Sequence, residues 1–487
     1  MDEARTAIRR VLLLLLAASM AGAHVGSPDV YFEGSAGPYP LFVTIRPPVV
    51  IPGVAQIEIR SSSAGLQKMS VTPIPLSGEA SEHAPTPDTM QASKLDPQFF
   101  TGSLWIMETG SWQVRIDANG TVGPGRLSVP VAAVANRTKT MNVTLGAVLS
   151  VLMLALGIGV VSIAGAGVRE AQVEPGAKVP PEYRTRARIA MGVTAIALVA
   201  ILCLGNLWWS AEASDYSRYL YKPLVMTPSL EGSKLVLQLS DPGWLASRKL
   251  DDFVPDHTHL MHLYVIRWPE LDRVWHLHPE MIATGRFVQQ LADLSEGGYK
   301  LYADVVHADG FPETMVADLL VKSGVRGQPL SGDDAAGSGP PIDASSAGAT
   351  VAMLPDGSRM VWDREAAPLQ TKTPRLFSFH IEDARGQVVH DLELYMGMPG
   401  HAAFVRTDGA VFAHIHPSGT VAMPALALAN PSQGMNMQAP PAEVSFPYGF
   451  PSPGRYRIIV QLKRAGAVQT GIFDALVKLA SLADKRY

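Results

Sequence analysis

A histidine pattern occurs twice in the C-terminal half of this chain. In each copy a first histidine is followed, after thirteen or twelve residues, by the sequence His-x-His-Pro. Alternate residues of a β-strand project to the same face, so His-x-His places two imidazoles side by side, and a histidine on the preceding strand can complete a three-ligand metal site. The sequence therefore predicts two metal-binding hairpins, whose ligands are His262, His276 and His278 in the first and His401, His414 and His416 in the second.

The similarity between the two copies extends beyond the histidines. Segment 260–279 aligns with segment 399–417, with a difference of one residue between the outer histidines. Further along, segments 298–307 and 454–463 both read as an alternating strand that follows a glycine turn. Two related domains are therefore expected in this half of the chain.

Other histidines are candidate ligands with weaker support. Eleven of the thirteen histidines lie after residue 250, and His257, His259 and His307 could add ligands to the first of the two domains only. His380 and His390 are interpreted as structural, because a single histidine is more often a hydrogen-bonded or surface residue than a ligand.

Methionines favour copper over the other metals that imidazole binds. Imidazole alone suits copper, zinc, nickel or iron, whereas the thioether sulfur selects soft Cu(I). Met396 and Met398 precede His401, and Met435 and Met437 lie in a polar stretch flanked by prolines. We therefore expect copper, with zinc as the alternative.

A catalytic site is the less favoured interpretation. Three histidines can hold a zinc ion with an open position for an activated water molecule, and Glu280 or Asp309 could then act as a base. The sequence has no His-Glu-x-x-His helix, serine nucleophile context or phosphate-binding loop. A binding protein is expected rather than an enzyme, and a metal-free scaffold that binds an envelope partner remains a further alternative.

The N-terminal part carries targeting and membrane signals. Residues 1–23 have the basic, apolar and small-residue regions of a secretory signal peptide. Two uncharged apolar runs, 141–168 and 189–210, are long enough to span a bilayer. The loop between them, 169–188, contains five basic residues and is expected in the cytoplasm, so that both large soluble regions lie outside.

Composition narrows the classes of function. A formal net charge of -4, with no basic stripe, gives no indication of a nucleic-acid partner, and a single cysteine excludes a disulfide framework within the chain. Short alternating runs separated by proline and glycine predict a mainly β fold with three immunoglobulin- or cupredoxin-like β-sandwich domains plus two transmembrane helices. The sandwiches are expected at 24–138, 215–322 and 350–480, with a linker at 323–349.

The histidine hairpins resemble those of the YtkA-like and CopC-like extracytoplasmic domains, over roughly residues 230–322 and 370–478. This resemblance implies copper handling. It also draws attention to His24, which cleavage after Ala23 would make the first residue, so that its amine and imidazole could chelate one copper ion. The expected protein is anchored in a bacterial inner membrane and acquires, buffers or delivers copper to an acceptor or transport protein on the periplasmic side.

Overall fold

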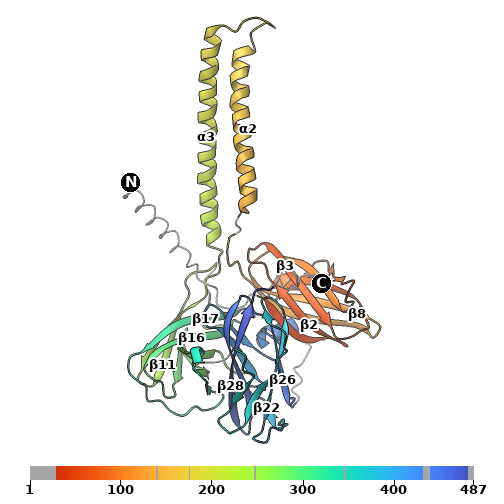
Figure 1. Cartoon of the computed structure of the whole chain (residues 1–487), viewed down its shortest axis with the longest axis vertical. Coiled ribbons are helices and arrows are strands. Elements are labelled where there is room, and N and C mark those ends of the chain that lie inside the picture. Colours follow the sequence, from red (N-terminus) through yellow and green to blue (C-terminus); the bar gives the residue numbers. More distant parts are fainter. Residues whose placement is uncertain are drawn as a thin grey trace. The chain divides into compact units, whose positions relative to one another are not determined.

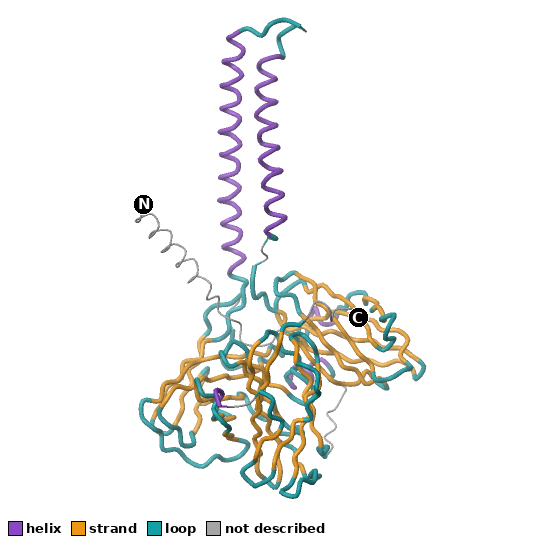
Figure 2. Tube along the Cα trace, in the orientation of Figure 1, coloured by secondary structure: helices purple, strands orange, loops and turns teal. Residues whose placement is uncertain are grey.

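The computed structural model describes residues 29–138, 141–174, 176–245, 248–344, 347–431 and 439–480. The chain divides into two compact units, of which one contains the three sandwiches and the other spans residues 135–220. The three sandwiches are built mainly from strands, as Figure 2 shows, and the two long helices lie next to each other in their own unit (Figure 1). The mainly β architecture with two long apolar helices confirms the expected fold class.

The first sandwich packs a five-stranded sheet, in the order β1-β2-β3-β7-β6, on a four-stranded sheet, in the order β5-β4-β8-β9. Alternating apolar residues such as Ile57 and Ile59 point into its core. Its elements are β1 (Val30–Ala36), β2 (Tyr39–Arg46), β3 (Gly53–Ser61), β4 (Leu66–Pro75), η1 (Glu79–Glu82), β5 (Asp88–Thr89), β6 (Gln91–Ala92), β7 (Phe99–Ile106), β8 (Gly110–Gly120) and β9 (Gly123–Ala133).

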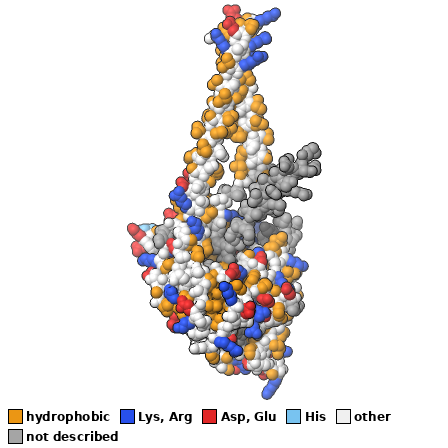
Figure 3. Space-filling view, turned by 90° about the vertical axis from the view of Figure 1, so that its left-hand side faces the viewer, with side chains coloured by type: hydrophobic (Ala, Val, Ile, Leu, Met, Phe, Trp, Pro, Cys, Tyr) orange, Lys and Arg blue, Asp and Glu red, His pale blue; other side chains and the backbone are white. Residues whose placement is uncertain are grey.

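The helical unit consists of α2 (Val143–Glu170) and α3 (Pro181–Ser217), both long and apolar enough to cross a membrane. Asn142 caps α2 by accepting hydrogen bonds from the backbone at Thr144 and Leu145. The helices approach closely at Gly165, where a β-carbon would lie 2.6 Å from the Cγ of Met191. Lys and Arg side chains gather at the loop end of the pair (Figure 3). Because α3 begins at Pro181, the last third of the expected loop is helical.

The second sandwich packs the sheet β17-β16-β12-β13-β18 on the sheet β10-β11-β15-β14. The expected linker is not wholly irregular, because residues 335–338 form β18, which pairs with β13. The elements are β10 (Val225–Glu231), β11 (Lys234–Ser240), β12 (His262–Trp268), β13 (Arg273–Leu277), β14 (Glu280–Ala283), β15 (Arg286–Gln290), β16 (Gly297–Val306), β17 (Pro312–Val321), β18 (Ala335–Ser338) and η2 (Ile342–Ala344).

The third sandwich repeats this arrangement. Its strand order β28-β27-β24-β25 matches β17-β16-β12-β13 of the second sandwich, and the sheet β19-β20-β22-β26 covers the other side of its core. Its elements are β19 (Val351–Met353), β20 (Arg359–Trp362), β21 (Leu369–Gln370), β22 (Arg375–Glu382), β23 (Leu392–Glu393), β24 (His401–Arg406), β25 (Phe412–Ile415), α4 (Met423–Ala429), β26 (Glu443–Tyr448), β27 (Gly454–Arg464) and β28 (Ala467–Lys478).

The second and third sandwiches share an apolar core between their equivalent sheets. On β12, Leu263 and Val265 point into the core of the second sandwich, whereas Tyr264 and Ile266 enter a separate cluster with Val405 and other residues of the third. Both faces of β12 and β24 are therefore buried, which explains why these strands are apolar at nearly every position.

Polar and aromatic contacts reinforce this interface. The rings of Tyr302 and Phe412 stack with their centroids 4.4 Å apart. Arg457 is paired with Asp474 at 2.9 Å within the third sandwich and also donates to the carbonyl of Leu271 in the second. These contacts fix how the two histidine hairpins face each other.

Candidate metal centre

The strands of the second sandwich place three histidines on the face that meets the third. His262 begins β12, His276 lies on β13, and His278 follows two residues later, so strand alternation directs all three to the same side. One ring nitrogen from each lies within 4.8 Å of the others, and all three residues are buried. We call this group the second-domain triad.

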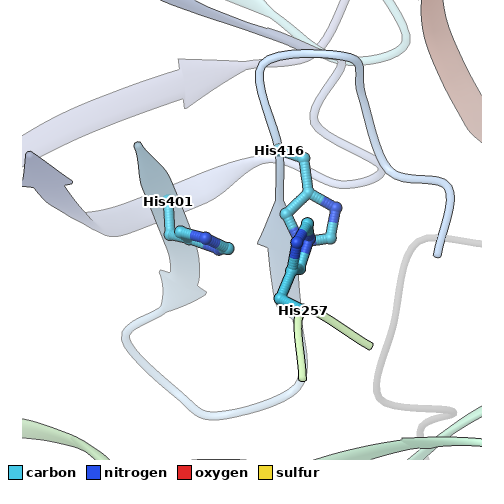
Figure 4. Close-up of side chains that lie close together, drawn as sticks. All are labelled: His257, His401 and His416. Carbon is cyan, nitrogen blue, oxygen red and sulfur yellow. The ribbon is translucent and has the colours of Figure 1, made fainter. Parts of the chain in front are cut away.

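The corresponding group in the third sandwich recruits a residue from the second. His401 on β24 and His416 after β25 lie with one ring nitrogen each within 4.8 Å of a nitrogen of His257. Figure 4 shows His257 approaching the two other rings from a separate segment of the chain. We call these three residues the interdomain triad. His414 adjoins it, with its Nε2 3.2 Å from the Nδ1 of His401.

In the second-domain triad, one nitrogen of each ring is held by a protein group. The Nε2 of His262 lies 2.9 Å from the carbonyl oxygen of Asp256, the Nδ1 of His276 lies 2.8 Å from Gln461, and the Nδ1 of His278 lies 3.0 Å from Asp334. When these nitrogens donate, the opposite nitrogen of each ring is left as an acceptor, and two of these acceptors, the Nδ1 of His262 and the Nε2 of His276, lie 3.2 Å apart. Such outer partners orient the histidine ligands of metal sites.

The interdomain triad has the same arrangement of outer partners. His401 uses its Nε2 toward the carbonyl of Tyr395 at 3.3 Å, and His416 uses its Nδ1 toward the carbonyl of Val421 at 3.4 Å. Among the side chains that the structure describes, the buried Nε2 atoms of His257, His278 and His416 have no hydrogen-bond partner. A buried nitrogen without a partner costs free energy, and a bound cation would satisfy it.

Burial holds the clustered imidazoles in their neutral form. Loss of hydration lowers the pKa of His257, His262 and His416 to about 3, and neighbouring histidines add to the effect. The same causes place the pKa of His276 and His414 well below the ordinary range. Neutral imidazole is the form that binds metal, so protons compete weakly for these sites near neutral pH.

Outer partners of the two hairpins are exchanged between the sandwiches. Gln461 on β27 of the third sandwich holds His276 of the second. In return, Asp304 on β16 of the second lies 3.4 Å from the Nδ1 of His414 in the third. Gln461 is the cross-strand partner of His401 in the third sandwich, and Asp304 is the cross-strand partner of His262 in the second. The two exchanged residues therefore occupy equivalent positions in the repeat.

His414, which adjoins the interdomain triad, connects it to the second-domain triad. The ring centroids of His262 and His414 are 5.2 Å apart, and those of His276 and His414 are 5.6 Å apart. The centroids of His262 and His276, within the second-domain triad, are a similar 5.4 Å apart. The histidines therefore form one continuous cluster with two groups able to hold an ion.

Several predicted ligands lie outside the triads. His307 contacts Asp252 at 2.7 Å and Glu313 at 3.2 Å, and these carboxylates raise its pKa against the effect of burial. His259 stacks on His278 with centroids 4.0 Å apart, while its Nε2 lies 3.1 Å from Asp333. Met396 and Met398 are buried on the turn before His401. The remaining predicted ligands, His24, Met435 and Met437, lie outside the described residues.

The residues considered as structural or as bases are placed as follows. His380 contacts Asp363 at 2.7 Å, and His390 is exposed. Glu280 is exposed on β14, and the exposed Asp309 accepts a hydrogen bond from the backbone of Phe311. Both carboxylates are therefore exposed to solvent and lie outside the buried histidine cluster.

Sequence reasoning did not identify the outer partners or Tyr264. The ring of Tyr264 stacks on His276 with centroids 4.2 Å apart, is fully buried, and carries a hydroxyl without a hydrogen-bond partner. Strand alternation provided a signal for it, because Tyr264 is two residues after His262 and therefore shares its face. Gln461 and Asp304 gave no such signal, because they act across a domain interface.

Comparison with known proteins gives a partial family match. Residues 350–478 match a family described as a domain of unknown function (DUF8832), which is less than half of the chain. No curated protein matches the chain.

Solved structures resemble the chain only at low similarity. Salmonella α-2-macroglobulin reacted with methylamine covers 94% of this chain with 8% identity and a TM-score of 0.18, and this chain spans 24% of it. Trypsin-activated α-2-macroglobulin from Escherichia coli covers 94% with 10% identity and a TM-score of 0.17, with the chain again spanning 24%. A tetra-tandem repeat of a large adhesion protein covers 88% with 9% identity and a TM-score of 0.16, and 71% of it is spanned.

Proposed function

We propose that this protein is a membrane-anchored extracytoplasmic copper-binding protein that acquires or buffers copper, or delivers it to an acceptor. The observation that carries the proposal is the orientation of the histidines. Outer groups hold rings of both triads, while among the described side chains the buried Nε2 atoms of His257, His278 and His416 have no hydrogen-bond partner, and that of His257 lies 3.5 Å from the carboxylate of Asp256. A purely structural histidine cluster would satisfy these atoms, because orphaned buried polar groups are rare.

The combination of imidazole and thioether ligands favours copper among the metals that bind imidazole. Neutral imidazoles accept Cu(II), Cu(I) and Zn(II), and the two triads alone do not separate these ions. Two buried methionines, Met396 and Met398, lie on the turn that precedes His401. Thioether sulfur in such a position adds affinity for Cu(I) and little for zinc.

Binding and release fit this site better than catalysis does. The side chains of the triad histidines are buried, that of His257 being 5% exposed, and neither Glu280 nor Asp309 is enclosed with them. A catalytic zinc site requires an open coordination position that substrate can reach. Two buried sets of ligands without an enclosed base are suited to holding an ion.

The proposed location follows from the helices. Both are long and apolar enough to span a membrane, and the segment between them is basic. The positive-inside rule places that segment in the cytoplasm and the three sandwiches outside. The uncharged apolar runs favour an anchor over an ion pathway, because transport usually leaves ionisable groups inside the membrane.

The test is metal analysis of the full chain purified in detergent after growth with copper and zinc. We expect copper to be retained, and a variant with His278→Ala and His416→Ala to lose it. The matched control is His380→Ala, which removes a histidine of the third sandwich that is held by Asp363 away from the triads. Zinc instead of copper, or unchanged copper in the double variant, would contradict the proposal.

A further inference from the structure

Two turns in the histidine cluster are structurally equivalent. Residues 256–259 and 395–398 each form a turn closed by a reciprocal pair of backbone hydrogen bonds, between Asp256 and His259 in one and between Tyr395 and Met398 in the other. Each turn precedes the first histidine of its hairpin by the same number of residues. The carbonyl of Asp256 holds the Nε2 of His262, as the carbonyl of Tyr395 holds that of His401.

The second residue of each turn occupies the same backbone conformation. His257 and Met396 both have a φ of 50°, which is uncommon for residues other than glycine. The residues that follow them, Thr258 and Gly397, have φ values of 76° and 77°. By position and backbone geometry, Met396 is therefore the counterpart of His257.

His257 acts away from its own sandwich. It belongs to the second sandwich in the chain, yet its imidazole completes the triad of the third with His401 and His416. The turn of the third sandwich reaches in the opposite direction. The hydroxyl of Tyr395 donates to the carbonyl of Asp333 at 2.7 Å and lies 3.5 Å from the Nδ1 of His276.

Met396 packs where the two sandwiches meet, close to a strand that borders the second-domain triad. It is 8% exposed and lies in a cluster with Tyr395 and Val468 of the third sandwich and Ala335 of the second. Ala335 belongs to β18, where it is the cross-strand partner of His276. The turn that carries Met396 therefore contacts the second sandwich beside His276.

We propose that Met396 supplies a thioether ligand to the ion held by His262, His276 and His278. This proposal rests on the proposed metal-binding function and refines it. The exchange that brings His257 to the interdomain triad would then be mutual, and the two sites would differ in chemistry. The second-domain triad becomes a set of three histidines and one methionine suited to Cu(I), while the interdomain triad remains imidazole only.

This assignment reverses the order of preference expected from the sequence. The sequence predicts that the third domain holds Cu(I) more tightly if Met435 and Met437 join its histidines. The mutual exchange instead gives Met396 to the second-domain triad. The site with the thioether ligand is then the one formed by β12 and β13, although its methionine comes from the third sandwich.

The test uses X-ray absorption at the copper edge on the full chain in detergent, loaded with one equivalent of Cu(I). A His416→Ala background disables the interdomain triad, so that copper loads the second-domain triad. We expect sulfur scattering in this background, and its loss on Met396→Leu with a decrease in Cu(I) affinity of roughly tenfold or more. Zn(II) affinity should change much less, because zinc gains little from a thioether.

The matched control is Met398→Leu, which changes the same residue type on the same turn. Its counterpart in the second sandwich, His259, stacks on His278 of its own sandwich, so Met398 is expected to stay with the third. Leucine has a volume similar to that of methionine, and such exchanges usually cost less than about 1.5 kcal/mol. A second variant, Met396→His, should replace the sulfur scatterer with nitrogen and retain Zn(II) binding.

The outcomes separate this inference from the proposed function. Copper bound with nitrogen scatterers alone, unchanged by Met396→Leu, would overturn the role of Met396 and leave the copper function standing. Loss of sulfur scattering on Met398→Leu instead would assign the ligand to that residue and also overturn the inference. A parent protein that binds no copper would contradict the proposed function itself.

Discussion

Acidification should destabilise the metal-free protein, because folding buries imidazoles that cannot accept protons. The pKa of His257, His262 and His416 is lowered from 6.5 to about 3 by burial. A lowered pKa in the folded state means that the unfolded chain binds more protons below pH 6.5. The stability associated with these groups is therefore present above pH 6.5 and is lost as the pH falls toward 3.

The size of the effect follows from the linkage relation. Each of these histidines lowers the free energy of unfolding by about 1.4 kcal/mol for every pH unit below its pKa in the unfolded chain. At pH 5.5 the three together cost about 4 kcal/mol relative to pH 7.5, which is a large part of the roughly 5–15 kcal/mol that stabilises a typical domain. The other buried histidines, whose pKa is also lowered, add to this loss. Asp256 and Asp304, whose pKa burial raises to about 7, take up protons in the folded state over the same range and offset part of it.

The assay is thermal unfolding of the metal-free full chain, followed by tryptophan fluorescence from pH 7.5 to pH 5.5. Unfolding should shift to much lower temperature across this range. A variant that replaces His257, His262 and His416 with glutamine should lose part of the shift and keep the part due to His276, His278, His401 and His414, whose pKa burial also lowers. His380→Gln should retain the whole shift. An equal shift in the triple variant and the parent would refute the reasoning.

Three further predictions concern the interface, a buried ion network and the membrane segments. Arg457→Ala leaves the carboxylate of Asp474, which is 4% exposed, without its partner, and it should lower the free energy of unfolding by about 3–5 kcal/mol in denaturant titrations. His307 has a raised pKa, so its contribution is present below pH 6.5 and is lost as the pH rises through the raised value; His307→Ala should flatten this alkaline loss in thermal unfolding. Reporter fusions should place Val179 in the cytoplasm and Ser338 outside, and a cytoplasmic Ser338 would contradict the proposed compartment.

The sequence predicts the parts of the metal centre that depend on strand geometry. The period of two along a strand places His276 and His278 on one face, and the pairing of β12 with β13 brings His262 next to them. The repeat predicts the second hairpin in the same way. These inferences are local and need no knowledge of how the domains pack.

The remainder of the site depends on the interface, which the pattern does not specify. The period of two says which face a histidine occupies but not what covers that face. The nearly continuous apolar run 260–266 was a signal that both faces of β12 are buried. The composition of 323–349 predicts a linker, and two domains joined only by a linker would be expected to bind metal independently.

The exchange of His257 has a direct consequence for that expectation. A ligand of the interdomain triad lies in the second sandwich, and His414 connects the two triads through its contacts with His262 and His401. Residues in contact are expected to show coupled rather than additive effects. Loss of metal from one site should therefore change the affinity of the other. Separately expressed domains would also expose the shared core that contains Tyr264 and Val405.

The most direct measurement is anomalous scattering at the copper edge from crystals of the copper-loaded protein. The account predicts two copper peaks, one bounded by His262, His276 and His278 and the other by His257, His401 and His416. The second peak is the stricter test, because its ligands come from two different sandwiches. Copper peaks only at surface histidines such as His390, or the absence of ordered copper from both triads, would contradict the central claim.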